Sequence, residues 1–260
     1  MDVLDHLFGV AGKTVLVTGG SRGIGASIAE TFVKAGARVY ICSRSATDCA
    51  DTAARLAELG ECHAIPADLA TAEGRTALVA EFLSREEKLE VLINNAGAIW
   101  AAPLAEYPES GWDKVFNLNV KGLFFLIRDL APALRRAGSH HDPARVINIG
   151  SIDGFHIPKH ETYAYSSAKA AAHQLSKHLA DQLAPDHITV NVIAPGMFPS
   201  KMLKGTLEAK GEETIVAPIP LKRLTNGDDM GGTALFLAGR ASAYVTGAVI
   251  PVDGGYATLL

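Results

Sequence analysis

The sequence predicts an α/β fold: one domain over residues 1–260, with a seven-stranded, doubly wound parallel sheet and helices on both of its faces. The first observation behind this is that short β-branched runs alternate with longer helix-like stretches along the whole chain. The second is that the strand-like runs are nearly all apolar, as strands covered on both faces are. The third is that no repeat, low-complexity tract or Pro/Gly/Ser-rich linker divides the 260 residues, 48% of which are hydrophobic.

The expected strands follow one another with room for a helix between most neighbours. They are Thr14 to Thr18, Arg38 to Ser43, Cys62 to Ala67, Val91 to Asn94, Arg145 to Ile149, Thr189 to Ile193 and Ala248 to Val252. The segment Ile24 to Ala35, after the first strand, has apolar residues along one helical face. Helix ends are marked by Gly36 and Gly60 as C-terminal caps, and by Ser45 with Asp48 and Thr225 with Asp228 as N-terminal caps.

Composition and charge favour a small-molecule partner. The formal charge is -4, and no block of like charges gives the footprint of a nucleic-acid or membrane-surface protein. The three cysteines, Cys42, Cys49 and Cys62, have no CxxC spacing, which favours a reducing, cytoplasmic compartment. The N-terminus lacks a basic signal-peptide region, and no apolar run approaches the roughly 18 residues of a spanning helix. We therefore expect a cytoplasmic protein that binds neither nucleic acid nor membrane.

A glycine-rich turn follows the first strand and leads into the first long helix. It reads Thr18-Gly19-Gly20-Ser21-Arg22-Gly23-Ile24-Gly25. Glycines let the backbone approach a pyrophosphate, whose charge meets the amides and the positive dipole end of the helix. The turn therefore predicts a dinucleotide site that includes Gly19, Ser21, Arg22, Gly23, Ile24 and Gly25. A tight turn used only for packing is the alternative.

The end of the second strand indicates which dinucleotide binds. A carboxylate about 20 residues beyond the glycines reads a free ribose hydroxyl, whereas a base accommodates a 2′-phosphate. Here the strand ends in Ser43-Arg44, and Arg22 extends from the glycine turn, so NADP(H) is preferred, with NAD(H) not excluded. The alternative is that both arginines are ordinary solvent-exposed side chains on surface turns. Asp68, in Asp68-Leu69 after the third strand, is a candidate for adenine contact or for a helix N-cap.

Tyr165 and Lys169 are the candidate catalytic pair. They lie four residues apart in the expected helix Tyr163 to Leu183, so they share one helical face. A fixed ammonium lowers the pKa of a nearby phenol and makes it a better acid at neutral pH. Tyr163 lacks such a partner, because its i+4 residue is Ser167. A surface cation beside an aromatic ring is the alternative for the pair.

At this point the sequence resembles the NAD(P)-dependent short-chain dehydrogenases/reductases, over essentially its whole length. The family's motifs occur in order: the TGxxxGxG turn at Thr18 to Gly25, NNAG at Asn94-Asn95-Ala96-Gly97, the active-site Asn at Asn119, the Ser at Ser151, YxxxK at Tyr165 and Lys169, and the late Pro-Gly at Pro195-Gly196. The resemblance implies a Rossmann fold. It also implies that Asn95, Ala96, Gly97, Pro195 and Gly196 join Ser43, Arg44, Asp68, Leu69, Tyr165 and Lys169 around the cofactor.

The resemblance also implies catalytic roles. Tyr165 gives a proton to a carbonyl oxygen as hydride reaches its carbon, and Ser151 donates a hydrogen bond to the same oxygen. Lys169 lowers the Tyr165 pKa and binds the nicotinamide ribose, while Asn119 holds a water in a proton path. For Asn119, a helical side chain that bonds a backbone carbonyl is the alternative.

Two departures from the family pattern stand out. Ser151 lies 14 residues before Tyr165, one more than in most members, so the insert between them is expected to reshape the pocket mouth. The polar loop Gly138 to Pro143 is expected to have no chemical role.

The segment 195–224 is the expected lid over the substrate. Its apolar side chains, including Met197, Met202 and Ile215, suggest an acyl or lipidic substrate, although packing against the body or a neighbouring subunit is equally open. Within the family, the chain looks most like NADPH-dependent 3-oxoacyl reductases of the rhamnolipid-pathway type. Trp100, Phe155 and His156 follow strand ends and are candidate pocket walls.

The expected function is thus that of an NADPH-dependent carbonyl reductase acting on a 3-oxoacyl thioester or a related oxo compound. The resemblance also implies an oligomer, with a homotetramer preferred and a dimer left open, and the apolar stretch Tyr244 to Leu260 is a candidate for the interface. An alcohol, sugar or steroid dehydrogenase remains open, as does a catalytically silent NADP-binding regulator, which the complete catalytic set argues against. No metal is expected: the pairs His156 with His160 and His173 with His178 lack metalloprotease spacing, and Pro158 interrupts the first.

Overall fold

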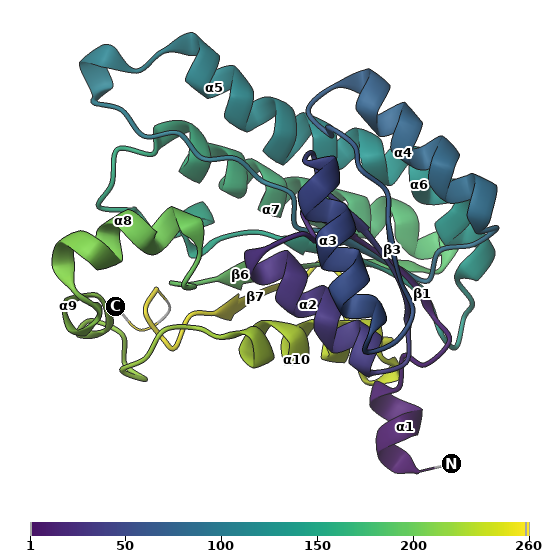
Figure 1. Ribbon diagram of the computed structural model, residues 1–260. Helices are drawn as coiled ribbons and strands as arrows, with labels where there is room; N and C mark the ends of the chain where they lie inside the picture. The colour runs from purple at the N-terminus through teal and green to yellow at the C-terminus, as the bar shows by residue number, and fades with distance from the viewer. Residues whose placement is uncertain (1, 258, 260) are drawn as a thin grey trace.

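Parallel strands organise the molecule. In the computed structural model, which describes residues 2–257 and 259, seven of them form one sheet in the order β3-β2-β1-β4-β5-β6-β7, and the predicted fold class is confirmed (Figure 1). Their bounds are β1 (Thr14–Thr18), β2 (Arg38–Cys42), β3 (Cys62–Ala64), β4 (Val91–Asn94), β5 (Ala144–Ile149), β6 (Ile188–Pro195) and β7 (Val249–Val252). Two of the predicted strands, β1 and β4, have the predicted bounds.

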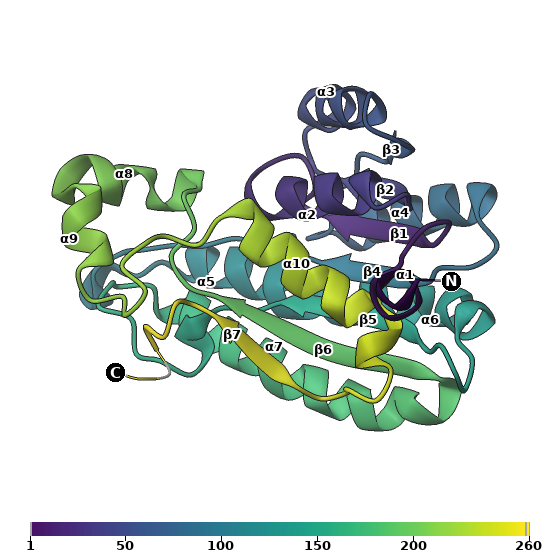
Figure 2. The same ribbon diagram turned by 90° about the horizontal axis from the view of Figure 1, so that it is seen from below.

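Helices cover both faces of the sheet, and α2, α3 and α10 lie on the side seen in Figure 2. Helices α4, α6 and α7 pack on the opposite face (Figure 1). Helix bounds are α1 (Val3–Phe8), α2 (Gly23–Lys34), α3 (Ala46–Ala57), α4 (Ala72–Arg85), α5 (Glu109–Phe116), α6 (Leu123–Ala137), α7 (Tyr163–Leu183), α8 (Lys201–Lys210), α9 (Glu212–Val216) and α10 (Gly227–Ala238). No helix among the described residues is long and apolar enough to cross a membrane.

Two apolar cores fix these layers, one on each face of the sheet. Phe32 of α2 and Leu237 of α10 are fully buried in the first, and Phe82 of α4 and Leu130 of α6 are fully buried in the second. Burying such a side chain stabilises the fold by about 1.5–3 kcal/mol. Because side chains alternate along each strand, neighbouring strand residues enter opposite cores, which explains why the strands are apolar throughout.

The third strand is shorter than predicted. Its regular part ends at Ala64, because Pro66 has no N–H with which to continue the ladder. The amides of Ile65 and Ala67 still donate to the carbonyls of Ile41 and Ser43, at 2.9 and 3.0 Å. The chain therefore stays hydrogen-bonded to the segment of β2 as far as Ala67, which is the last residue of the predicted strand.

Two of the predicted caps are confirmed. Gly36 adopts φ +81° after α2, and the Ser45 side chain accepts from the Asp48 amide at 3.2 Å. Gly60 is not a left-handed cap; its missing Cβ instead admits Val33, whose Cγ1 lies 2.9 Å from the ideal Cβ position.

The N-cap of α10 lies one residue later than predicted. Asn226 accepts from the Asp229 amide, and Asp229 accepts from the Asn226 amide, both at 2.9 Å. The Thr225 hydroxyl donates instead to the carbonyl of Val252 at 3.4 Å, so it is engaged with the last strand.

The strand order reverses between β1 and β4, which are neighbours in the sheet. From β1 the chain runs outward through β2 and β3, and then returns to add β4 to β7 on the other side. In open α/β sheets a crevice forms beyond the carboxyl ends of the strands at such a reversal. Thr18 and Asn94 pair with each other at this point, so the glycine turn and the segment after β4 begin side by side.

Candidate active site

The glycine turn links the end of β1 to α2. Gly19 and Gly23 adopt φ values of +64° and +55°, which side chains with a Cβ disfavour. A Cβ on Gly19 would lie 2.7 Å from Nδ2 of Asn95, and one on Gly25 would lie 2.3 Å from the carbonyl oxygen of Gly19. The glycines are therefore required by both the backbone conformation and the close packing of the turn.

Asn95 holds the turn in place. Its Nδ2 donates to the carbonyls of Thr18 and Gly19, at 3.1 and 3.0 Å. The hydroxyl oxygen of Thr18 in return accepts from the amides of Asn95 and Ala96, at 3.0 and 3.1 Å. The side chain of Asn95 thus braces the glycine turn, and the chain continues through Ala96 to the exposed Gly97.

The turn fits an anionic group. Arg22 occupies the N-cap of α2 with extended backbone, and its side chain makes no capping hydrogen bond to the helix. A Cβ on Gly23 would meet nothing closer than the Cβ of Ser200 at 3.9 Å, so this part of the turn is open. A helix N-terminus bordered by such glycines is suited to a pyrophosphate.

The arginine-bearing segments are tied to each other. The Thr52 hydroxyl of α3 donates to the carbonyl of Ser21 at 2.9 Å, and the Gly20 amide donates to the carbonyl of Cys42 at 3.1 Å. Arg22 and Arg44 are both exposed, and Ser43 is half-buried. Arg22 and Arg44 thus lie on adjoining segments, which follow β1 and β2 respectively.

Asp68 accepts a hydrogen bond from a nearby backbone amide but is not the N-cap of α4. Its Oδ1 accepts from the Ala70 amide at 3.0 Å, but the N-cap of α4 is Thr71, which accepts from the Gly74 amide at 3.0 Å. The N-cap alternative for Asp68 is therefore wrong. Leu69 is buried beside it, and its carbonyl accepts from Arg75 at 3.0 Å.

The predicted catalytic residues gather at the carboxyl end of β5. The Lys169 ammonium donates to the carbonyl of Ile149 at 2.7 Å and lies 5.6 Å from the centre of the Tyr165 ring. The Ser151 hydroxyl hydrogen-bonds the Tyr165 phenol, and its oxygen also accepts from the Asp153 amide at 3.1 Å. Tyr163, by contrast, packs its ring at 5.7 Å from that of Tyr107 and is 36% exposed.

The predicted lowering of the Tyr165 pKa is wrong for this structure. Burial, together with the charge of Asp153, raises the pKa of Tyr165 to about 12, although the hydrogen bond from Ser151 acts in the opposite direction. Burial also lowers the pKa of Lys169 to about 8, partly offset by Asp153. Desolvation of the phenol is the largest cause of this shift, and the Lys169 ammonium donates to the carbonyl of Ile149.

Asn119 lies in a π-helical segment (Asn117–Gly122) between α5 and α6. Its Oδ1 accepts from the Ala98 amide at 2.8 Å, and its Nδ2 donates to the Ala98 carbonyl at 2.9 Å. Asn119 thus bonds a backbone carbonyl, as in the alternative interpretation of this residue, but the carbonyl belongs to the segment after β4. A Cβ on Gly97 would lie 3.4 Å from Asn119 Oδ1 and 3.9 Å from Lys169 Nζ, so Asn119 fixes a strand extension beside the ammonium.

The segment after β6, which includes the expected lid, is partly helical. Pro195 ends the strand, and the Gly196 amide donates to the carbonyl of Val252 at 2.9 Å. Helices α8 and α9 follow, with Ile215 buried, while the side chain of Met202 lies outside the described residues. In Figure 1 both helices lie at the same end of the molecule as the C-terminus.

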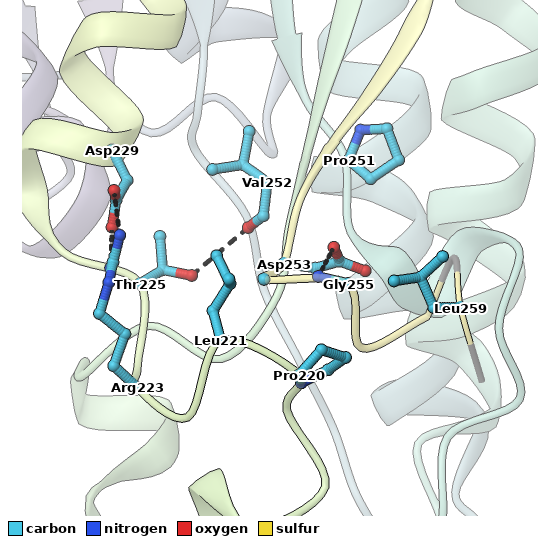
Figure 3. A pocket seen from close by; sticks show the side chains of 11 residues that line it. Pro220, Leu221, Arg223, Thr225, Asp229, Pro251, Val252, Asp253, Gly255 and Leu259 are labelled. Carbon is cyan, nitrogen blue, oxygen red and sulfur yellow. Dashed lines mark hydrogen bonds and ion pairs between the residues drawn. The ribbon is translucent and has the colours of Figure 1, made fainter.

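A cavity of about 520 Å³ lies where the end of this segment meets the C-terminal chain (Figure 3). Pro220, Leu221 and Leu259 are among its apolar lining residues, and Arg223 pairs with Asp229 at its rim. Tyr165 is not among the lining residues, so the cavity is separate from the catalytic group.

The candidate pocket walls lie in two places. Trp100 packs in an apolar cluster with Tyr165. Phe155 is 48% exposed, and the His156 ring lies 5.4 Å from that of Tyr256, which joins the Ser151 turn to the C-terminal chain.

Sequence reasoning did not identify Thr52 or His173 as part of the site. Both act through backbone groups distant in sequence, and a hydroxyl or imidazole within a helix gives no local signal of such a contact. In the sequence, His173 stands out only through its spacing from His178; the structure places its ring against the Ser151 turn.

A family model described as enoyl-(acyl carrier protein) reductase matches residues 19–257. The chain belongs to this family of short-chain dehydrogenases/reductases, oxidoreductases that act on CH–OH/C=O pairs.

Individual relatives cover nearly the whole chain. The rhamnolipids biosynthesis 3-oxoacyl-[acyl-carrier-protein] reductase of Pseudomonas aeruginosa is 50% identical over 250 residues, 96% of this chain and 98% of that protein. The 2-dehydro-3-deoxy-D-gluconate 5-dehydrogenase of Bacillus subtilis is 34% identical over 98% of this chain and 99% of its own length. A solved Pseudomonas aeruginosa RhlG/NADP active-site complex has a TM-score of 0.94 and 49% identity, covering 97% of this chain and 99% of that one.

The raised pKa of Tyr165 is testable in the protein without ligand. Tyrosinate absorbance, recorded as the difference between wild type and Tyr165→Phe, should rise only above the ordinary phenol value of 10.0, toward about 12. Because the folded phenol holds its proton more tightly than the unfolded one, this group's contribution to stability is lost as pH rises through that window. A difference signal centred below pH 10 would contradict the burial argument.

Proposed function

We propose that this chain is an NADPH-dependent carbonyl reductase that converts a 3-oxoacyl thioester, or a related oxo compound, to the hydroxy product. The observation that carries the proposal is the meeting of Ser151, Tyr165 and Lys169 at the end of β5. The 50% identity to a 3-oxoacyl reductase, against 34% to a sugar-acid dehydrogenase, supports the acyl substrate over the alternatives.

The proposed cofactor is NADP(H). The glycine turn, Asn95 and Gly97 would hold its pyrophosphate and nicotinamide ends, and the exposed guanidinium groups of Arg22 and Arg44 would meet the 2′-phosphate. No carboxylate stands at the end of β2 to repel that phosphate. The solved relative described as an NADP complex supports the same choice.

The proposed mechanism assigns one task to each catalytic side chain. NADPH, when bound, supplies the hydride. Tyr165 keeps its phenolic proton at neutral pH, since its pKa is raised, and gives it to the carbonyl oxygen of the substrate. The Ser151 oxygen accepts from the Asp153 amide, so its hydroxyl hydrogen, which is directed to the Tyr165 phenol in the free protein, can instead be donated to the carbonyl oxygen of the substrate and stabilise negative charge there.

Lys169 and Asn119 support this transfer. Lys169, with a pKa of about 8, remains mainly protonated at pH 7 and places a cation next to the phenol. It would also bind the ribose of the cofactor. Asn119 fixes the backbone of Ala98 beside Lys169. We propose that the segment 195–224 closes over the substrate, with its apolar side chains against the acyl chain.

The proposed compartment is the cytoplasm, which the three unpaired, buried cysteines support.

We also propose a homotetramer. Large apolar side chains are exposed at Trp112 of α5, at Phe124 of α6, and at Tyr244 and Leu259 of the C-terminal stretch. Contact with other subunits would bury such side chains.

Light scattering on the purified protein tests the assembly. The expected mass is four times the 27.4 kDa of one chain. A mass of one or two chains would show the tetramer to be wrong.

Replacing the proposed proton donor tests the chemistry. Tyr165→Phe should lower kcat by roughly 10²–10⁴-fold, the usual contribution of a general acid. NADPH binding, followed by nucleotide fluorescence, should be unchanged, because the glycine turn and arginines are intact. Wild type is assayed with a 3-oxoacyl thioester, a 2-enoyl thioester and a polyol. Undiminished turnover in the variant, or wild-type activity on the polyol with NAD alone, would refute the proposal.

The role of the arginine at the end of β2 is tested by reversing its charge. Arg44→Asp should raise KM for NADPH and lower the ratio of kcat/KM values for NADPH and NADH by about tenfold or more, since a carboxylate repels the 2′-phosphate. Arg55→Asp, at an exposed arginine of α3 that pairs with Glu30 at 3.0 Å, serves as a charge-reversal control. An unchanged ratio in Arg44→Asp would contradict the phosphate contact.

A further inference from the structure

The imidazole of His173 lies inside the turn that carries Ser151. His173 is one helical turn beyond Lys169 on α7 and is 6% exposed. A Cβ on Gly150 would lie 2.2 Å from its Nε2, and one on Gly154 would lie 2.4 Å from its Cε1. The Phe155 ring covers it at 5.9 Å between centroids. The turn from Gly150 to Phe155 is thus wrapped around this ring, and its two glycines admit it.

The ring is also bonded to the turn. The Ser151 amide donates to Nε2 of His173 at 3.4 Å. Nε2 is therefore the acceptor nitrogen, and the proton of the neutral ring is on Nδ1. Burial and the charges of Lys169 and Lys177 lower the pKa of His173 to about 4, so the acceptor persists at neutral pH.

This contact bears on the serine hydroxyl. Two residues after Ser151, the Asp153 amide donates to the Ser151 oxygen at 3.1 Å, and this donor determines where the hydroxyl hydrogen can point. The position of the Asp153 amide depends on the short turn Ile152–Gly154, which rests on the imidazole through Gly154. The ring thus supports both the amide of Ser151 and the group that orients its side chain.

We propose that His173 is a positioning residue: its Nε2 and its ring hold the Ser151 turn so that the serine hydroxyl faces Tyr165 and the substrate oxygen. The inference rests on the proposed role of Ser151 in carbonyl reduction. It goes beyond packing, because a side chain of equal size without an acceptor would leave the buried Ser151 amide unpaired.

A matched pair of variants separates the effect of the hydrogen-bond acceptor of His173 from the effect of its side-chain volume. Gln and Met are both unbranched and similar in size, but only Gln offers a strong acceptor near the position of Nε2. His173→Met should lower kcat roughly 10- to 100-fold, as expected for a misplaced catalytic group, with KM for NADPH within about twofold. His173→Gln should recover most of the rate. His178→Met, at an exposed position of the same helix, is the control and should match wild type.

Combination with Ser151→Ala distinguishes positioning from a general structural effect. If His173 acts through the serine hydroxyl, His173→Met should cause no further loss of kcat in the Ser151→Ala background. An equal loss in both backgrounds, a wild-type rate in His173→Met, or an equal loss in the Gln and Met variants would overturn the inference. If His173→Met does not fold, His173→Leu, which also lacks an acceptor, is compared in the two backgrounds and decides in the same way. Wild-type enzyme without carbonyl reductase activity would instead refute the proposed function.

Discussion

The hydrogen bond from the Lys169 ammonium to the carbonyl of Ile149, at 2.7 Å, joins the long helix α7 to the end of strand β5. It holds a buried cation where the sheet ends, and Tyr165, one turn earlier on the same helix, is brought over the serine turn. An ammonium buried without a partner would be costly, so the rotation of α7 against the sheet is constrained by this contact. The site that we propose depends on that constraint.

A similar contact between a side chain and the backbone at a strand end is found where the strand order reverses. Asn95 ties β4 to the glycine turn with its side-chain amide, and the turn can approach it only because Gly19 and Gly25 lack a Cβ. In both places a side chain from one element bonds the backbone at the end of a neighbouring strand. The crevice is therefore preorganised by the protein itself, with the open end of α2 on one side and the Tyr165 and Lys169 pair on the other.

Local patterns in the sequence predicted the class of the fold, the bounds of β1, β4 and α7, and the positions of Tyr165 and Lys169. They could do so because apolar runs and i,i+4 spacing depend only on near neighbours. The direction of the Tyr165 pKa shift could not be predicted, since it depends on burial and on the charge of Asp153. The position of His173 in the site could not be predicted for a related reason: its acceptor nitrogen contacts a turn 22 residues earlier in the chain. Thr225 and Asn226 are adjacent and either could cap α10. Thr225 donates to the carbonyl of Val252, and Asn226 is the N-cap.

The most direct test of this account is a crystal structure of the protein with NADP bound. The account predicts the pyrophosphate on the glycine turn, the 2′-phosphate between Arg22 and Arg44, and the nicotinamide end within reach of both the Lys169 ammonium and the Tyr165 hydroxyl. A nicotinamide ring remote from the Tyr165 hydroxyl, or a nucleotide seated outside the crevice between β1 and β4, would contradict it.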